Sequence, residues 1–362
     1  MKCILIILLY LNFTSTLKSN KASKVLKKSK NPMFTILSWN SRWWEDFGVC
    51  KKYNCLYTDN RKLLKNADAI MFNDFFYNCD TDMKNIVKRP KKSTLYVNVF
   101  SESFVRNKIR LGKLSLPYPK NYFNLTYTYL PNGDIYRSYG NDTFQIKNLT
   151  SHNIQILEEK LHKSFKNKKK DIIWLVSNCE TPSGRMIAVN ALKKYLNVVQ
   201  YGSCNKKSIK LSDNEKKKLF EKHYFYIASE NTDCKHYITE KFFERFFYDS
   251  IPIVSVRKLY DGYAPPNSFI AMDDFESPQK MGEFLNKLKN DKNEYLKYFE
   301  YRKLGWVQKQ EKFDSRCYIC KELIKFYKSK KQRIYPDIKR WQKESNECLP
   351  NNYIPRKWKL TR

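Results

Sequence analysis

The segment His223–Val256 constrains the fold of this chain more than any other stretch. Its pattern predicts a buried strand, an amphipathic helix and a second buried strand, at Tyr224–Ser229, Thr239–Asp249 and Ile251–Val256. Two apolar runs that flank a helix are typical of a β-α-β unit. Glu240 and Lys241 fall in the first turn of this helix, at the end of the sheet where open α/β folds bind ligands. On its own, the same pattern also describes a β-α-β unit with two solvent-exposed charges.

The rest of the chain repeats this alternation of strands and helices, most regularly in its second half. There we expect further elements at Asp171–Ser177, Ser183–Leu196, Val198–Tyr201, Asp213–Glu221, Ser268–Met272, Pro278–Asn290 and Glu294–Tyr301. In the first half we expect strands at Phe34–Trp39, Asp68–Asn73, Thr94–Phe100 and Phe123–Leu130, a short helix near Arg61–Asn66 and a helix near Ile154–Phe165. Strands that alternate with helices predict α/β domains.

The length of 362 residues favours two domains with ample core. We expect an N-terminal domain over residues 31–165, a C-terminal domain over 166–330 and a tail over 331–362. The predicted fold class is α/β, with two Rossmann-like domains facing a central cleft.

The first residues combine one lysine with an apolar run that ends near Phe13 or Leu17. This run is shorter than the roughly 20 residues of a membrane-spanning helix. It resembles the core of a signal peptide or a short signal-anchor, and a basic stem follows it as far as Lys30. We therefore expect residues 1–30 to direct the chain into the secretory pathway.

Lysine and arginine outnumber aspartate and glutamate by 69 to 36, which gives a formal net charge of +33. The lysines occur in short runs along the whole chain, at Lys27–Lys30, Lys168–Lys170, Lys216–Lys218 and Lys328–Lys331. A nucleic-acid-binding protein concentrates its charge on one face or arm. We therefore expect a solvated surface that favours an anionic substrate or membrane, and no nucleic-acid partner. Nucleic-acid binding stays as an alternative that only the charge supports.

Nine of the ten cysteines lie beyond the first residues. Cys317 and Cys320 form a CxxC pair, but no second pair or histidine spacing completes a zinc site. In an oxidising compartment disulfides are the expected use, and an odd number leaves at least one thiol free. Asn124, Asn141 and Asn148 begin sequons and are candidates for N-glycosylation.

Familiar nucleotide-binding motifs are missing from the sequence. No GxGxxG or Walker loop occurs, so the dinucleotide-binding and P-loop classes lose their main support. Asp80-Thr81-Asp82 has the form of a DxD metal motif, but three residues match easily by chance. We therefore expect no metal site.

A second stretch has the chemistry of a phosphate site. The predicted strand at Asp171–Ser177 ends in Ser177 and Asn178, and Arg185 opens the next helix. Polar groups at the end of a strand and an arginine at the start of a helix suit a phosphate ligand. Taken alone, the stretch is equally consistent with a capped turn and a surface arginine.

Together the two stretches resemble the α-1,3-fucosyltransferase family. The resemblance rests on Ser177-Asn178-Cys179, Pro182 and Arg185, followed by Glu230-Asn231 and Tyr237-Ile238-Thr239-Glu240-Lys241. Further matches are Pro265–Ile270, Asp273–Pro278, Phe123–Tyr127, Asp134-Ile135 and Tyr139-Gly140. The resemblance covers residues 95 to 302 and is most specific at Tyr237–Lys241. It departs at Ser229, where the family has an aromatic residue.

The resemblance implies a GT-B fold, whose C-terminal domain binds GDP-fucose as the donor and whose N-terminal domain binds the acceptor. It implies that Arg185 and Lys241 neutralise the pyrophosphate and that Glu240 accepts hydrogen bonds from the ribose hydroxyls. The other implied donor-binding residues are Tyr139, Ser177, Asn178, Tyr226, Asn231 and Tyr237. Fixed cations suit this position, because the departing GDP gains negative charge.

The implied reaction inverts the anomeric carbon and needs one base on the acceptor side. Glu102 aligns with a Glu-Ser segment of the family and is the candidate base. The two cations supply the charge that leaving-group departure needs, so no metal cofactor is required, although Mn²⁺ is a candidate stimulator.

The resemblance also implies a local or tail-tethering disulfide of Cys317 and Cys320, with Cys348 as another partner.

The family acceptors are the N-glycan core and Lewis-type N-acetyllactosamine, carried on glycoproteins or oligosaccharides. The implied location is the Golgi membrane, as a type II protein with its catalytic domain in the lumen. The alternative is a catalytically inactive glycan-binding protein on the same fold.

Overall fold

The structure is a computed structural model and describes residues 33–40, 46–74, 87–106, 118–140, 143–205, 211–309, 313–330 and 333–361. The chain forms two compact units. The first runs to Tyr136 and includes Phe313–Ser345, and the second comprises Arg137–Lys312 and Asn346–Arg362. These bounds differ from the expected divisions at residues 165 and 330. Residues 137–165 group with the second unit, and the chain after Lys312 contributes first to one unit and then to the other.

A seven-stranded sheet forms the centre of the first unit, in the order β2-β3-β1-β4-β5-β6-β7. Neighbouring strands are parallel except at the edge, where β2 pairs antiparallel with β3. The strands are β1 (Phe34–Ser38), β2 (Gly48–Cys50), β3 (Cys55–Thr58), β4 (Ala69–Asn73), β5 (Leu95–Phe100), β6 (Leu125–Thr128) and β7 (Ile135–Tyr136). The four strands predicted here are confirmed, and their mostly buried residues are typical of parallel strands covered on both faces.

Helix α10 (Ser315–Ser329) packs against the hairpin of β2 and β3. Two disulfides fix it there, between Cys317 and Cys50 and between Cys320 and Cys55. The implied disulfide within the CxxC pair is therefore wrong. Residues three apart on a helix face the same side, so both cysteines reach the hairpin.

The other elements in the described part of the first unit are short. They are α11 (Ile338–Ser345) and the 3-10 helices η1 (Lys51–Tyr53) and η2 (Arg61–Asn66). The second unit holds two more disulfides, Cys179–Cys204 and Cys234–Cys348. Cys348 thus pairs with a loop cysteine and not with the CxxC pair. Cys79 lies outside the described residues.

The second unit contains a five-stranded sheet, parallel throughout, in the order β10-β9-β11-β12-β13. The strands are β9 (Lys170–Leu175), β10 (Val198–Tyr201), β11 (His223–Ile227), β12 (Ile251–Val254) and β13 (Ile270–Ala271). A separate antiparallel pair joins β8 (Phe144–Ile146) to β14 (Trp306–Gln308). The predicted doubly wound pattern is confirmed.

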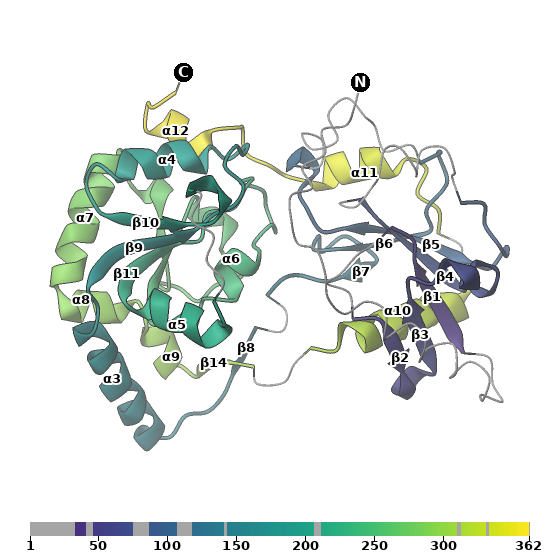
Figure 1. Cartoon of the computed structure of the whole chain (residues 1–362), viewed down its shortest axis with the longest axis horizontal. Coiled ribbons are helices and arrows are strands. Elements are labelled where there is room, and N and C mark those ends of the chain that lie inside the picture. Colours follow the sequence, from purple (N-terminus) through teal and green to yellow (C-terminus); the bar gives the residue numbers. More distant parts are fainter. Residues whose placement is uncertain are drawn as a thin grey trace. The chain divides into compact units, whose positions relative to one another are not determined.

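Helices cover both faces of this second sheet. Figure 1 shows α4 and α7 on one side of it and α5 and α6 on the other, and each pair contributes to a separate apolar core. The helices are α3 (Ser151–Lys166), α4 (Arg185–Leu192), α5 (Asp213–Glu221), α6 (Glu240–Phe243), α7 (Pro278–Asn290), α8 (Lys292–Lys297), α9 (Glu300–Lys303) and α12 (Tyr353–Lys357). The 3-10 helices are η4 (Ser203–Asn205), η5 (Arg257–Leu259) and η6 (Met272–Asp274).

Helix α6 is much shorter than the predicted helix over 239–249. After Phe243 the chain continues in turns with i to i−3 hydrogen bonds, such as Tyr248 N–H to the Arg245 carbonyl at 2.9 Å. Phe242 and Phe246 still pack together in the core, with ring centroids 5.0 Å apart. The apolar spacing therefore identified the buried face correctly but overestimated the length of the helix.

Lys168 belongs to a lysine run that we expected to be solvated, yet it is only 6% exposed. Its ammonium group donates to the carbonyls of Glu221 and His223 at 3.1 Å each, and to the carbonyl of Asp249. Burial lowers the pKa of Lys168 to about 7, against the opposing effects of the Asp249 and Glu221 charges. This lysine therefore ties together three chain segments at one end of the second sheet.

We expect Lys168→Met to lower the free energy of unfolding by about 3 kcal/mol, because three buried carbonyls lose their donor. Chemical denaturation of the purified protein measures this loss. Lys169→Met is the matched control, since Lys169 is exposed and should change stability by less than about 0.5 kcal/mol. Equal losses in the two variants would contradict the structural role of Lys168.

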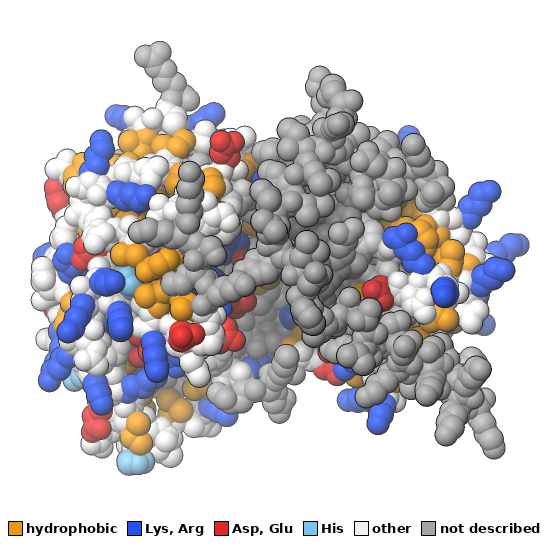
Figure 2. Space-filling view, viewed as in Figure 1, with side chains coloured by type: hydrophobic (Ala, Val, Ile, Leu, Met, Phe, Trp, Pro, Cys, Tyr) orange, Lys and Arg blue, Asp and Glu red, His pale blue; other side chains and the backbone are white. Residues whose placement is uncertain are grey.

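The described surface is rich in charge. Figure 2 shows Lys and Arg side chains spread over the visible face of the second unit, with Asp and Glu among them. Among the described residues, no helix has the length and apolar character to cross a membrane. The predicted signal-anchor and stem, residues 1–30, lie outside the described residues.

Candidate active site

Strand order in the second sheet reverses between β9 and β11, because the chain adds β10 on one side of β9 and then β11, β12 and β13 on the other. Ligands of open α/β sheets bind at the carboxyl ends of the strands beside such a reversal. Two loops begin there, residues 176–184 after β9 and residues 228–239 after β11. The topology of the sheet therefore places both sequence motifs, Ser177–Arg185 and Glu230–Lys241, at the expected ligand-binding edge.

Arg185 begins α4, and its side chain turns into the protein, leaving 4% of the residue exposed. Its Nη1 donates to the Ser229 carbonyl at 2.8 Å, and its Nη2 donates to the Asn178 carbonyl at 3.1 Å. The guanidinium thus joins the loop after β9 to the loop after β11. It holds a permanent positive charge at the reversal of strand order.

Lys241 supplies a second positive charge from helix α6. Its Nζ lies 3.0 Å from Oε2 of Glu230 and 3.2 Å from Oε1 of Glu240, and it donates to the Thr239 hydroxyl at 2.8 Å. Burial lowers the pKa of Lys241, but the charges of Glu230 and Glu240 raise it more, so the ammonium stays protonated. The charge of Arg185 opposes this rise, so the two cations lie within electrostatic reach of each other.

Glu240 is the accessible member of this cluster, with 44% of its side chain exposed. Burial raises the pKa of Glu240, but Lys241 outweighs this effect and lowers it overall, so the carboxylate is charged at neutral pH. An exposed carboxylate beside a cation suits a ligand that presents both hydroxyls and phosphates.

Glu230 organises the cluster, and the sequence analysis gave it no role. It is 3% exposed and accepts hydrogen bonds from the Thr239 N–H at 2.8 Å and from the Thr239 hydroxyl at 2.9 Å. Burial raises the pKa of Glu230, and the charge of Lys241 opposes that rise. The sequence marks this residue only as an acid directly after a buried strand and as part of the Glu230-Asn231 match to the family. Its carboxylate fixes the start of α6 and holds Lys241 in place.

The other residues predicted on the two loops differ in accessibility. Asn231 is 6% exposed, and its carbonyl accepts the Ser183 N–H at 3.1 Å. Tyr237 is 2% exposed. Ser177 is exposed, and its hydroxyl accepts the Ser203 N–H at 3.4 Å. Asn231 therefore contributes to joining the two loops, as Arg185 does.

Tyr139 reaches the same region from outside the two loops. It packs at the edge of the core that contains Phe242 and Phe243 of α6. The next residue, Gly140, lies against the ring of Phe243, where a Cβ atom would come within 2.4 Å of the ring. Tyr139 therefore belongs beside the helix that carries Glu240 and Lys241.

Tyr226 does not belong to the accessible site. It is fully buried on β11, and its hydroxyl donates to the Phe242 carbonyl at 3.4 Å. A parallel strand covered on both faces has no open side, so Tyr226 packs in the core beneath α5 and α6. The implied direct contact with the donor is therefore wrong in this structure.

Asp233 is a second buried carboxyl group that the sequence analysis did not identify, with 6% of the residue exposed. Burial raises the pKa of Asp233 to about 7, helped by the charge of Glu230 and opposed by a hydrogen bond with Ser255. Ser255 also bonds to Ser229 through their hydroxyls. At Ser229, where the family pattern has an aromatic residue, this chain therefore has a small polar cluster.

Asp233→Asn should stabilise the protein at pH 8 by on the order of 2 kcal/mol and much less at pH 5. The pKa of Asp233 is higher in the folded protein than in the unfolded chain. Between pH of about 4 and 7 the unfolded chain has lost this proton while the folded protein still holds it, so the stability of the wild type falls as pH rises through this range. Denaturation at both pH values measures the difference, with the exposed Asp261→Asn as the control. An effect of Asp233→Asn that does not change with pH would contradict this account.

Glu102, the predicted base, lies in the first unit, two residues beyond the end of β5. It is half-buried at the carboxyl ends of the parallel strands. Burial raises the pKa of the Tyr129 hydroxyl, and the charge of Glu102 raises it further, so the carboxylate lies near the end of β6. The structure therefore places Glu102 at the ligand-binding edge of its own sheet.

A buried polar network lies at the same edge and escaped the sequence analysis. Asn98 donates to Asp74 at 2.8 Å, and Gln342 of α11 donates to Asn98 at 2.8 Å and also to Asp74. Gln342 and Asn98 are 244 residues apart in sequence, so no local pattern could have indicated the contact.

The glycosylation candidates separate clearly. Asn124 is 8% exposed, and its amide accepts from the Tyr96 N–H at 2.9 Å and donates to the Arg333 carbonyl at 3.0 Å. Its role as a glycan acceptor in the folded chain is therefore wrong. Asn148 is exposed, and Asn141 lies outside the described residues.

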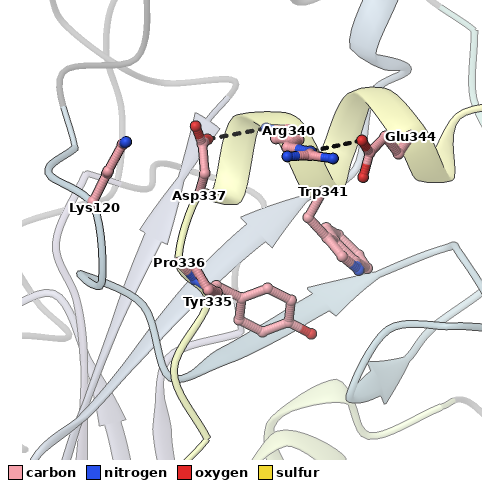
Figure 3. Close-up of a pocket in the computed structure, with 7 residues that line it drawn as sticks. All are labelled: Lys120, Tyr335, Pro336, Asp337, Arg340, Trp341 and Glu344. Atoms are coloured by element: carbon pink, nitrogen blue, oxygen red, sulfur yellow. Dashed lines mark hydrogen bonds and ion pairs between the residues drawn. The ribbon is translucent and has the colours of Figure 1, made fainter.

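An open groove of about 410 Å³ lies in the first unit along α11 (Figure 3). Tyr335 and Trp341 line it with rings 5.3 Å apart, and Arg340 pairs with Glu344 at 2.7 Å on its rim. None of the residues predicted for donor binding or proton transfer lines this groove.

No metal-binding group of three His, Cys, Asp or Glu occurs in the described part of the chain, and Asp80-Thr81-Asp82 lies outside that part.

Comparisons with known proteins agree with this arrangement. Residues 31–140 match the family model described as fucosyltransferase, N-terminal, and residues 165–341 match that of glycosyltransferase family 10 (fucosyltransferase), C-terminal. Alpha-(1,3)-fucosyltransferase fut-1 of Caenorhabditis elegans is 33% identical over 270 residues, which cover 74% of this chain and 58% of the relative. Glycoprotein 3-alpha-L-fucosyltransferase A of Drosophila melanogaster is 28% identical over 342 residues, which cover 90% and 63%. The chain therefore spans about three fifths of the length of these two relatives.

A solved structure shows the same fold. The crystal structure of an alpha1,3-fucosyltransferase matches with a TM-score of 0.51 and 16% identity, over 85% of this chain and 93% of that chain. The fold class is therefore that of the GT-B glycosyltransferases, with two Rossmann-like units. The two sequence matches then give the family, and the chain belongs to glycosyltransferase family 10, the fucosyltransferases.

Proposed function

We propose that this protein transfers L-fucose from GDP-β-L-fucose to a glycan hydroxyl in α-1,3 linkage, with inversion at the anomeric carbon. The observation that carries the proposal is the meeting of Arg185, Lys241 and Glu240 at the strand-order reversal of the second sheet. Two fixed cations suit a pyrophosphate, and an exposed carboxylate beside them suits the ribose hydroxyls.

The chemistry follows from this set of charges. The bond between the fucose anomeric carbon and the phosphate oxygen breaks, and its electron pair stays with GDP. Arg185 and Lys241 stabilise the growing negative charge, and they are already held in place by carbonyl and carboxylate partners. The acceptor oxygen attacks the opposite face of the carbon, and Glu102 takes its proton.

The proposed acceptor is a glycoprotein glycan, with the N-glycan core slightly favoured over Lewis-type N-acetyllactosamine. The name of the Drosophila relative, a glycoprotein 3-alpha-L-fucosyltransferase, supports a glycoprotein acceptor. We also propose a Golgi location with membrane attachment through residues 1–30. Mn²⁺ stays a candidate stimulator. Comparing the transfer rate with and without added Mn²⁺ tests this prediction.

Incubation with GDP-fucose on a glycan array tests the function. The proposal predicts fucose transfer to glycans with a free 3-hydroxyl on N-acetylglucosamine, and none from GDP-mannose or UDP-galactose. A protein that binds GDP and glycans but transfers no fucose to any of them would be the inactive glycan-binding alternative.

A further inference from the structure

Residues 346–361, called here the C-terminal strap, return to the second unit and contact both loops of the candidate donor site. We infer that the strap positions these loops for nucleotide binding, with Cys348 and Asn352 as its positioning residues. The inference rests on the proposed function, because the two loops are those assigned to GDP-fucose.

The strap is joined to the loop after β11 by one covalent bond and two backbone hydrogen bonds. Cys348 forms a disulfide with Cys234, four residues beyond Glu230 in the chain. The Lys235 N–H donates to the Glu347 carbonyl, and the Leu349 N–H donates to the Asp233 carbonyl, each at 2.8 Å. This short antiparallel pairing holds the loop that carries Glu230.

The same strap holds the loop after β9. The Asn352 N–H donates to the Pro182 carbonyl at 2.7 Å. Gly184, with φ of +66°, caps α4 directly before Arg185. A Cβ atom at Gly184 would lie 2.4 Å from Asn352 Oδ1 and 2.8 Å from Pro355 Cγ, so the strap lies against the backbone that leads into Arg185.

The strap can hold both loops because its other end is anchored in the core. Ile354 and Trp358 are 1% and 4% exposed and pack with residues of α4 and α7. The Trp358 indole N–H donates to the Phe275 carbonyl at 3.0 Å. Figure 1 shows α12 of the strap beside α4. Two loops that bear the charges of one site are therefore tied to a single fixed element.

Loss of the bonds between the strap and the two loops should affect nucleotide binding more than the chemical step. A loop that is free to leave its binding conformation lowers the fraction of competent molecules, and the apparent Kd rises by the inverse of that fraction. Saturating donor recovers the competent state, so kcat should change little. A residue needed only for folding would not produce this separation of KM from kcat.

The test compares the full-length protein with the double variant Cys234→Ser/Cys348→Ser. Calorimetric titration with GDP should show a rise in Kd of about tenfold, and KM for GDP-fucose should rise similarly while kcat stays within about twofold. Lys235→Ala is the matched control, because it removes only the exposed Lys235–Glu347 ion pair and keeps the disulfide. Cys50→Ser/Cys317→Ser removes a disulfide of the first unit and should leave GDP affinity unchanged.

A second variant covers the case in which the double variant fails to fold. Asn352→Gly accepts the local φ of +56° and removes the side chain that contacts Gly184, so it should also raise the Kd for GDP, by a smaller factor. Wild-type Kd values in the strap variants, or a loss of kcat with Kd and KM unchanged, would overturn the inference alone. Failure of the unaltered protein to bind GDP would instead overturn the proposed function.

Discussion

Lys241→Met is expected to lower kcat for fucose transfer by about a thousandfold, because it removes one of the two fixed charges that we propose to face the departing GDP. Methionine keeps much of the length and apolar contact of the lysine stem, so the change falls mainly on the charge. GDP release at saturating GDP-fucose and acceptor measures the rate. Lys235→Met, an exposed substitution six residues earlier, should leave the rate within about twofold.

The charge of Lys241 also has a structural role, which a second variant separates from catalysis. Without Lys241, the buried carboxylate of Glu230 loses its cation, which is expected to cost about 3 kcal/mol of stability. Glu230→Gln combined with Lys241→Met removes the uncompensated charge, so stability should largely return while transfer does not. If the double variant regained both, Lys241 would be structural only.

Glu102→Gln is expected to lower kcat by about a thousandfold and to leave GDP affinity unchanged, because glutamine keeps the shape of the side chain but cannot take the acceptor proton. Glu102 lies at the edge of the first sheet, whereas the proposed nucleotide site belongs to the second unit. Single-turnover transfer and GDP titration measure the two quantities separately.

Glu344→Gln is the control for this variant. Glu344 is an exposed carboxylate of the same unit, paired on the surface with Arg340, and its loss should change neither quantity. A Glu102→Gln protein with near-normal transfer would show that another group, or the solvent, takes the proton.

The fold was largely predictable because parallel strands leave a clear local signal. Strands such as β4 and β11 are short apolar runs between polar turns, and every strand predicted from such a run is present. The hairpin of β2 and β3 has no such signal, since disulfides to α10 more than 260 residues later hold it. Contacts at such separations depend on the complete fold, and the return of Phe313–Ser345 to the first unit is another example.

The charged residues predicted for the donor site lie in fixed local motifs. Arg185, Glu240 and Lys241 follow from such motifs, and the structure brings them to one place. Tyr226 and Asn124 were assigned wrongly, because a motif shows which residue is present but not that its side chain is buried. Glu230 and Asp233 were missed for the same reason, since composition alone suggests that acidic residues are exposed.

Hydrogen–deuterium exchange of the full-length protein with and without GDP tests the central claim most directly, because it locates the bound nucleotide. The account predicts slower exchange over residues 177–185 and 229–241, the two loops and helix starts at the strand-order reversal of the second sheet. It predicts little change over α11 in the first unit. Protection confined to the first unit, with residues 177–185 and 229–241 unchanged at saturating GDP, would contradict the account.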